Sequence, residues 1–183
     1  MADTAKHRCL ILLRHAKSSW ALGEARDHER PLNARGRHAA PLMGAHLASA
    51  GLVPDLVLCS DAARARETWA RLRPVLGAGP QGRPRVRYCP DLYLAEAPAI
   101  LARLARLGDR WRRVMVVGHN PGLQTLATRL AARADPAAAR RLAAKFPTAA
   151  AAVFRLGGAP WSALGPDGVR GVSLTVPRDL KDR

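Results

Sequence analysis

The sequence has few aromatic residues and no long apolar run. Phenylalanine, tyrosine and tryptophan make up 4% of its 183 residues. No apolar stretch approaches the roughly 20 residues that a membrane-spanning helix needs, and the segment before Cys9 is short and polar. We therefore expect a cytoplasmic protein with no membrane anchor and no membrane partner.

Cysteine is scarce as well, with three residues at positions 9, 59 and 89. An odd number of cysteines, two of them inside apolar runs, does not suggest a disulfide framework. The sequence also lacks the closely spaced Cys or His pairs that are typical of zinc sites. These absences predict a reducing compartment, no structural metal and no cofactor.

Acidic residues are the third shortage, since 14 Asp and Glu stand against 30 Lys and Arg, for a net charge of +16. Such a charge favours anionic partners without specifying one. A basic nucleic-acid-binding module is one hypothesis, but the sequence shows no recognition-helix pattern and its tryptophans are far apart, so we expect no specific nucleic acid as partner. Whether the arginines form one cationic face or are scattered stays open.

The apolar pattern alternates between strand-like and helix-like segments. Strands are predicted at Cys9 to Leu13, Leu56 to Cys59, Arg85 to Tyr88, Val114 to Val117, Ala150 to Leu156 and Gly171 to Val176. Helices are predicted at Ala34 to about Ala50, about Ala62 to Leu72, Ala97 to Leu107, after Asn120-Pro121, and at Pro136 to Lys145, with side-chain caps from Asn33, from Ser60 or Asp61, and from Asn120.

Four successive strand-helix units argue for an α/β fold, with a mainly parallel central sheet flanked by helices on both faces. The length fits one domain. We expect residues 1–183 to form that single domain, with residues 1–7 as a flexible N-terminus.

Charged and imidazole side chains follow three of these strands. Arg14 and His15 end the first, Ser60 and Arg64 follow the second, and His119 follows Gly118 after the fourth. In an open α/β sheet the carboxyl ends of the strands border the ligand crevice. The sequence therefore predicts an anion site that contains a nucleophile.

These segments carry a family resemblance. Leu12 to Trp20 (LLRHAKSSW), Ser60 to Thr68 (SDAARARET) and Val116 to Gly122 (VVGHNPG) resemble the motifs of the histidine phosphatase superfamily, in its SixA-like phosphohistidine phosphatase branch. Arg30 to Gly36 (RPLNARG) and Phe146 to Thr148 (FPT) extend the resemblance. It implies the three-layer, phosphoglycerate mutase-like fold and a metal-independent phosphatase.

The resemblance also implies roles for single residues. His15 would attack phosphorus and hold it as a phosphohistidine intermediate. Arg14 and Arg64 would clamp the phosphoryl oxygens, and His119 would add a further donor. Further phosphate contacts could come from Lys17, Ser18, Arg30 and Asn120, with Asn33 explained as a helix cap.

The general acid is the least defined role. Glu96 is the best candidate because it opens a predicted helix near the site, although Asp91, Glu24 and Asp27 are also near the expected mouth. An acid is dispensable if the leaving group is imidazole, whose pKa of about 6.5 makes it a far better leaving group than an alkoxide.

Three hypotheses follow. The first is a phosphatase acting on phosphohistidine of a protein, such as a phosphotransfer or phosphocarrier domain, because a chain too short for a lid insertion suggests an open site. The second is a small-molecule phosphomonoesterase or mutase of the same superfamily, acting on a phosphorylated metabolite. The third is the basic binding module.

Overall fold

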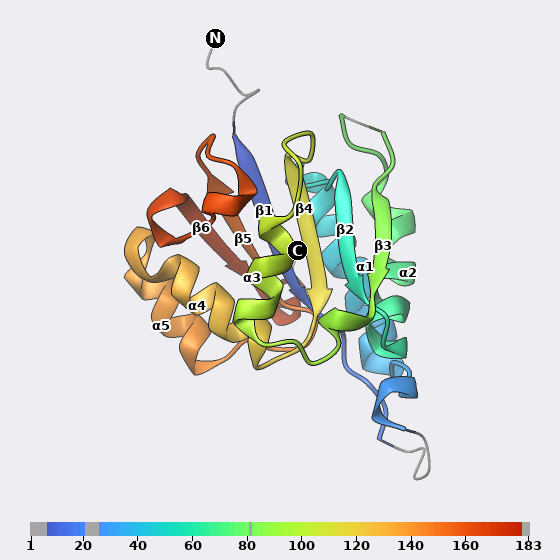
Figure 1. Ribbon diagram of the computed structural model, residues 1–183. Coiled ribbons are helices and arrows are strands. Elements are labelled where there is room, and N and C mark those ends of the chain that lie inside the picture. Colours follow the sequence, from blue (N-terminus) through green and yellow to red (C-terminus); the bar gives the residue numbers. More distant parts are fainter. Residues whose placement is uncertain (1–6, 21–25, 81, 181–183) are drawn as a thin grey trace.

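A computed structural model describes residues 7–20, 26–80 and 82–180 of the chain, and the expected flexible N-terminus of residues 1–7 lies outside them except for His7. The helices and strands alternate as predicted over the first four units (Figure 1). In chain order they are β1 (Arg8–Arg14), α1 (Ala34–Ser49), β2 (Leu56–Ser60), α2 (Ala63–Leu76), β3 (Arg85–Cys89), α3 (Ala97–Ala105), β4 (Arg113–Gly118), α4 (Gly122–Ala134), α5 (Pro136–Ala144), β5 (Ala151–Leu156) and β6 (Val169–Thr175). Short 3₁₀ turns include η2 (Asp27–Glu29), η3 (Pro90–Leu92) and η6 (Pro177–Leu180).

The six strands form one sheet in the order β3-β2-β4-β1-β5-β6. The strands β3, β2, β4 and β1 are parallel, whereas β5 and β6 run antiparallel to their neighbours. The predicted mainly parallel α/β fold is therefore confirmed. Because β4 lies between β1 and β2, the carboxyl ends of these three strands meet at one edge of the sheet.

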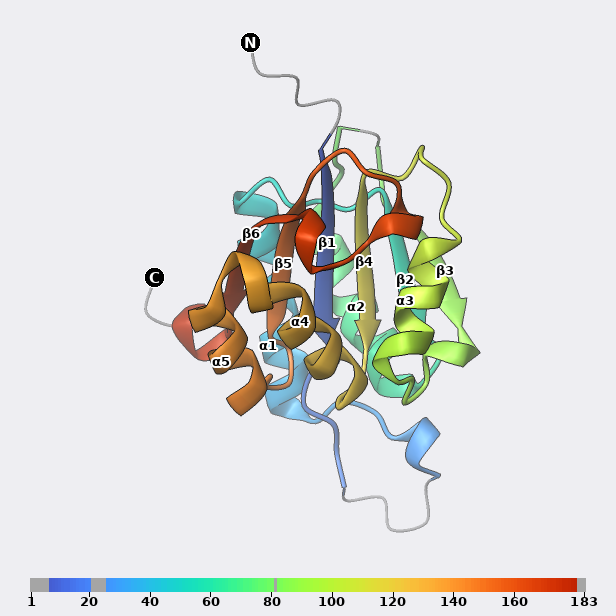
Figure 2. The same cartoon turned by 60° about the vertical axis from the view of Figure 1, so that its left-hand side comes forward.

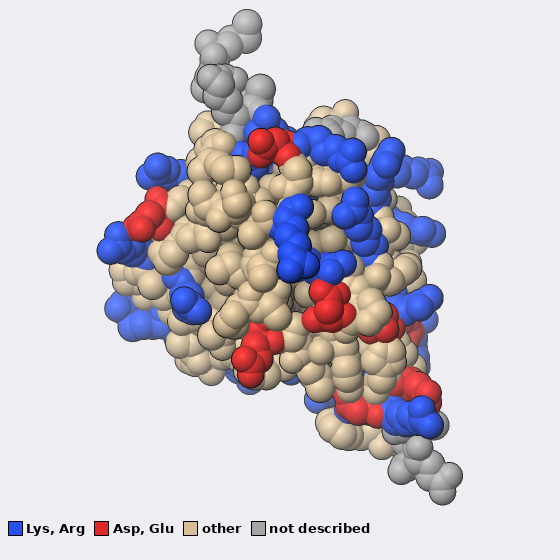
Figure 3. All heavy atoms as spheres, viewed as in Figure 1, with Lys and Arg blue, Asp and Glu red and all other residues tan. Residues whose placement is uncertain are grey.

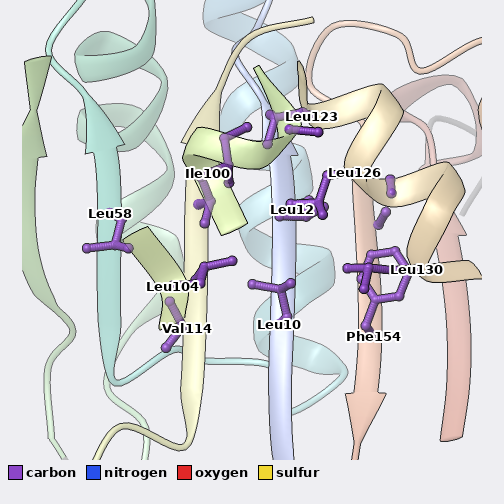
Figure 4. Packing of buried hydrophobic residues seen from close by; sticks show 14 of the residues in the cluster. Leu10, Leu12, Leu58, Ile100, Leu104, Val114, Leu123, Leu126, Leu130 and Phe154 are labelled. Atoms are coloured by element: carbon purple, nitrogen blue, oxygen red, sulfur yellow. The ribbon is translucent and has the colours of Figure 1, made fainter. Parts of the chain in front are cut away.

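Helices cover both faces of the sheet, as Figure 2 shows. Alternate residues of β1 point to opposite faces: Ile11 and Leu13 pack in a cluster with residues of α1 and α2, whereas Leu10 and Leu12 pack with residues of α3 and α4. Figure 4 shows the second cluster, in which Leu126 of α4 lies beside Leu12. Burying one such leucine contributes roughly 1.5–3 kcal/mol, so this core fixes the strand ends that carry the site.

Two of the three predicted helix caps are wrong. Asn33 caps α1 as predicted, since its side chain accepts a hydrogen bond from the Gly36 amide. Helices α2 and α4 have no side-chain cap, and Ala62 and Pro121 occupy their N-cap positions. Ser60 and Asn120 instead bond across the site, to His119 and to the Phe146 carbonyl, and Ser60 Oγ also accepts from the Ala62 amide at 3.3 Å, at the residue where α2 is about to begin.

The basic side chains are spread over the surface rather than gathered in one patch of the face shown in Figure 3. Figure 3 shows Lys and Arg over many parts of one view, including the end of the molecule where the parallel strands begin. At that end a cavity of about 740 Å³ is lined by five arginines, namely Arg8, Arg112, Arg113, Arg155 and Arg170. Among the described residues, no helix is both long and apolar enough to cross a membrane.

Candidate active site

The strand register brings the two predicted histidines together. Arg14 of β1 pairs with Gly118 of β4, and the His15 amide donates to the Gly118 carbonyl at 3.0 Å. The next residues along the two strands, His15 and His119, have ring centroids 5.1 Å apart. Both side chains are buried, with 8% and 2% of their surface exposed.

A single hydrogen bond fixes the tautomer of His15. Its Nδ1 lies 2.7 Å from the Ala16 carbonyl oxygen. A carbonyl oxygen only accepts, so Nδ1 carries the proton and Nε2 holds the lone pair. Burial, with smaller contributions from Arg64 and Arg14, lowers the pKa of His15 to about 4. At neutral pH the ring is therefore uncharged and its Nε2 is a nucleophile.

His119 is held by a different contact. Its Nε2 lies 2.8 Å from Ser60 Oγ, and its Nδ1 is buried without a partner among the described residues. Burial and then the neighbouring His15 lower the pKa of His119 to about 3. If the Ser60 hydroxyl donates to Nε2, the neutral ring presents an N-H at Nδ1 to a bound anion.

Arg14 is positioned by the segment that follows α5. Its Nη1 donates to the Phe146 carbonyl at 2.9 Å, and its Nε is buried without a partner among the described residues. The Ala149 amide donates to the carbonyls of both Arg14 and His15, at 3.1 Å each. The segment that contains Phe146 to Thr148, the FPT motif, therefore supports the carboxyl end of β1, where Arg14 and His15 lie. This gives the motif a structural role.

Arg64 belongs to the first turn of α2 and is 4% exposed. Thr68, one turn later, links this helix to the loop after His15, because its hydroxyl donates to the Arg64 carbonyl and accepts from the Ala16 amide. The Arg64 guanidinium donates to Asp27 twice, to the backbone carbonyl at 2.5 Å and to Oδ2 at 2.9 Å. Arg64 is thus oriented from both its backbone and its side chain.

Asp27 organises the mouth of the site, a role that sequence reasoning missed. Besides Arg64, its carboxylate accepts from Arg30 Nη1 and from the Tyr93 hydroxyl, each at 2.6 Å. The bond from Tyr93, followed by those from the arginines, lowers the pKa of Asp27 to about 2. Tyr93 also lies edge-on to His119, with ring centroids 5.5 Å apart.

The substrate-binding candidates divide into two groups. Arg30 and Ser18 are buried and bonded to each other, since Arg30 Nη2 donates to Ser18 Oγ at 2.8 Å. Asn120 follows His119 directly, and its amide donates to the Phe146 carbonyl at 3.0 Å. Lys17 is exposed, and its ammonium group has no partner among the described residues. It is therefore free to meet an anion at the rim.

The candidate acids lie at the periphery. Glu96 occupies the N-cap position of α3, is exposed and has no side-chain cap bond. Its backbone packs on α4, because a methyl group at Gly122 would overlap the Ala95 carbonyl and come within 3.1 Å of the Glu96 Cα. Asp91 is paired with Arg103 at 2.6 Å, and Glu24 lies outside the described residues.

The described residues include no group of three or more His, Cys, Asp or Glu side chains placed to hold a metal ion. What the site does gather is one neutral nucleophilic imidazole, a second neutral imidazole, the buried guanidinium group of Arg64 and the partly buried one of Arg14. This donor set is complementary to a tetrahedral oxyanion such as phosphate.

Comparison with known proteins gives consistent matches. The model of the histidine phosphatase superfamily (branch 1) matches residues 10–90. An uncharacterised Mycobacterium tuberculosis protein, Rv1276c, is 39% identical over 91% of this chain and 100% of its own length.

Two solved structures named for the phosphohistidine phosphatase SixA are also similar. The structure from Nakamurella multipartitia has a TM-score of 0.78 and 30% identity, and the match covers 93% of this chain and 96% of that one. The structure from Agrobacterium tumefaciens has a TM-score of 0.70 and 31% identity, and that match covers 81% and 92% of the two chains.

Proposed function

This chain belongs to the histidine phosphatase superfamily, and from that premise we propose that it removes phosphate from phosphohistidine of a protein, through a covalent intermediate on His15 and without a metal ion. The observation that carries the proposal is the fixed tautomer of His15. Its Nδ1 proton is engaged by the Ala16 carbonyl, which leaves the Nε2 lone pair free beside His119. A neutral, oriented imidazole is what in-line attack on phosphorus requires.

In the first step, the Nε2 lone pair of His15 forms a bond to phosphorus while the bond from phosphorus to the substrate nitrogen breaks. The His15 ring then carries phosphate on Nε2 and its original proton on Nδ1. It becomes a cation, which the hydrogen bond to the Ala16 carbonyl stabilises. In the second step, water attacks phosphorus and His15 leaves as neutral imidazole.

Arg14, Arg64 and His119 would stabilise both transition states. The two guanidinium groups face the charge that develops on the equatorial phosphoryl oxygens, and the unpartnered Nδ1 of His119 supplies one more donor. Because bonds to the Phe146 carbonyl and to Asp27 already orient the two arginines, little reorganisation is needed at the moment of reaction. Lys17, Ser18, Arg30 and Asn120 are proposed as further contacts of the bound phosphate.

The leaving group favours phosphohistidine over an alkyl phosphate. A substrate imidazole already protonated on its second nitrogen leaves as a neutral ring and needs no proton from the enzyme. An alkoxide needs one. Asp27 is kept ionised by its three donors and is a poor acid. In the alternative function, a small-molecule phosphomonoesterase, Glu96 would have to move inward to donate that proton.

The proposed partner is therefore a phosphorylated protein domain, and a phosphorylated metabolite belongs to the alternative. We further propose a cytoplasmic location and a single-domain organisation for residues 1–183. Cys9, Cys59 and Cys89 are free and buried, and burial raises the pKa of the Cys9 thiol to about 11. Such unreactive thiols suit a reducing compartment.

The test is phosphate release from a phosphohistidine-bearing protein domain and from p-nitrophenyl phosphate, both in EDTA. The intact protein should act on both and prefer the protein substrate, and His15→Ala should lose activity on both. Brief incubation with labelled substrate, followed by alkaline denaturation, should leave phosphate on the intact chain and none on His15→Ala.

His7→Ala is the matched control, because His7 is an exposed histidine beside the amino end of β1, far from the carboxyl ends of the strands. It should retain full activity. Full activity of His15→Ala, or a strict metal requirement, would overturn the proposal. Preference for a small phosphate ester would favour the alternative.

A further inference from the structure

A basic cleft of about 370 Å³ lies beside the loop that follows His15, here called the catalytic loop, and most of its lining has no role in the proposed mechanism. Its charged and polar lining comes from Lys17 in that loop, Arg35 and His38 of α1, Thr148 after α5, and Arg178 of η6. Ala39 and Leu42 provide an apolar floor. The cleft is thus assembled from four segments that are distant in sequence.

Three of these segments are fixed to the catalytic strand end. The Asn33 amide, just before α1, donates to the Lys17 carbonyl at 3.0 Å, and Gly36 packs so closely on that carbonyl that a methyl group would overlap it. Ala149, the neighbour of Thr148, donates to the His15 carbonyl. Figure 2 shows the start of α1 and the segment after α5 meeting near the end of β1. Three of the four segments that line the cleft are therefore held against the strand end that carries the nucleophile.

The charge of the cleft is of one sign. None of the residues that line it is acidic, and the side chains of Lys17, Arg35 and His38 have no hydrogen-bonding or ionic partner among the described residues. Arg178 has one weak ion pair, with Asp179 at 3.5 Å, and both side chains are exposed. An exposed pair of this kind contributes little energy, so Arg178 remains available to a stronger acceptor.

We propose that this cleft binds acidic side chains of the protein substrate while its phosphohistidine is at His15. The inference rests on the proposed function and adds a specificity site to it. Lys17 is two residues from His15, so the cleft begins within about 7 Å of the nucleophile along the chain. Carboxylates displayed roughly 10 Å from the phosphohistidine would reach it. A free phosphoramidate or an aryl phosphate has no group that could.

The test compares intact protein with the double variant Arg35→Glu/Arg178→Glu on two substrates, a phosphohistidine domain with acidic residues around the histidine and free phosphoramidate. The KM for the domain should rise about tenfold, because two attractive charges become repulsive, while turnover of phosphoramidate should change less than about twofold. Increasing salt should raise the KM of the intact protein for the domain and reduce the difference in KM between the intact protein and the double variant.

The matched control is Arg155→Glu/Arg170→Glu, which makes the same change of net charge in exposed arginines at the opposite edge of the sheet. It should leave the KM for the domain within about twofold of the intact value. An equal rise in both double variants would overturn the proposal, since net charge alone would explain it. An unchanged KM in Arg35→Glu/Arg178→Glu would overturn it too.

Two other outcomes identify competing explanations. If Arg35→Glu/Arg178→Glu weakens hydrolysis of a small bisphosphorylated compound as strongly as hydrolysis of the protein domain, the cleft is a second phosphate subsite and the docking proposal is wrong. If the intact protein hydrolyses neither the domain nor phosphoramidate, the proposed function fails and the docking proposal fails with it. Activity of the intact protein on phosphoramidate therefore separates the two failures.

Discussion

The carboxylate of Asp27 accepts a hydrogen bond from Arg64 at 2.9 Å, so the guanidinium proposed to bind phosphate already has an anionic partner inside the protein. The Asp27 carboxylate also accepts from Arg30 and Tyr93. Its pKa of about 2 keeps it charged at any ordinary pH. The pairing lowers the net positive charge at the mouth and orients the arginines. A strong anion such as phosphate then meets cations that are already aligned.

Replacing Asp27 by Asn tests this positioning role. Asparagine has one acceptor oxygen for the three donors, and its own N-H groups would face two of them, so Arg64 should lose its orientation. We expect kcat to fall by about tenfold to a hundredfold, with KM changed less than threefold. Asp167→Asn, which breaks an exposed pair with Arg133, is the control and should leave both constants unchanged. A rise in KM alone would mean that Asp27 acts on binding rather than on alignment.

The histidines should remain neutral far below the usual pH range. The pKa of His15 is about 4 because of burial and nearby arginines, so its ring should show no titration near pH 6.5 when followed by NMR. The unfolded chain binds that proton near pH 6.5 and the folded chain does not. The free energy of unfolding should therefore decrease as pH falls from about 6.5 to about 4, and less so in His15→Gln. A His15 signal titrating near 6.5 would contradict the proposed electrostatics.

Arg14 has a structural role and a proposed catalytic role. Its Nη1 donates to the Phe146 carbonyl, which leaves the rest of the guanidinium for phosphate. A lysine in this position would have a single ammonium group for both, so Arg14→Lys should lower kcat about a hundredfold. The control is Arg140→Lys, an exposed change on α5. Equal kinetics in the two variants would exclude a fork-shaped contact from Arg14.

Gly36 is required by the close approach of α1 to the catalytic loop. A methyl group at this position would overlap the Lys17 carbonyl, which is backbone and cannot rotate away. Gly36→Ala should lower the free energy of unfolding by about 1–3 kcal/mol and reduce kcat by moving the loop after His15. Gly108→Ala, where a methyl group meets nothing within 4 Å, should unfold at the same denaturant concentration as the intact protein. Matching stability in both variants would refute the contact.

Sequence patterns predicted the elements of the fold because the apolar periods are clear. Ile11 and Leu13 alternate with Leu10 and Leu12 on a strand buried on both faces, and Asn33 has the local geometry of a cap. The strand ends then implied that His15 and His119 would meet. The strands and helices could be predicted because their apolar patterns lie within short stretches of sequence. The meeting of the two histidines then follows from the parallel arrangement of the strands.

The missed features depend on contacts between distant residues. Tyr93 and Asp27 are 66 residues apart, and Tyr93 follows a 3₁₀ turn that no periodicity marks. Ser60 is expected to cap α2 because it precedes that helix, but Ala62 is the N-cap residue, and the Ser60 hydroxyl bonds to His119 as well as accepting from the Ala62 amide. The sequence placed Asp27 near the expected mouth as a candidate acid, but it gave no sign that the carboxylate would instead accept hydrogen bonds from Arg64 and Tyr93. Such tertiary hydrogen bonds outweigh the local capping preference of a residue. They cannot be predicted from the sequence before the positions of the strands are known.

The last prediction concerns Glu96 and the leaving group. Glu96 is an exposed carboxyl at the start of α3 that has no side-chain partner among the described residues, and its proposed use in the site would be to protonate an alkoxide. Glu96→Gln should therefore lower turnover of an alkyl phosphate about tenfold or more, and leave phosphohistidine turnover within about twofold, because imidazole leaves without help. Asp109→Asn, another exposed acid but one bound to Arg8, is the control. Equal loss on both substrates would show that Glu96 acts on phosphate binding or on the fold, since a proton donor would discriminate between the two leaving groups.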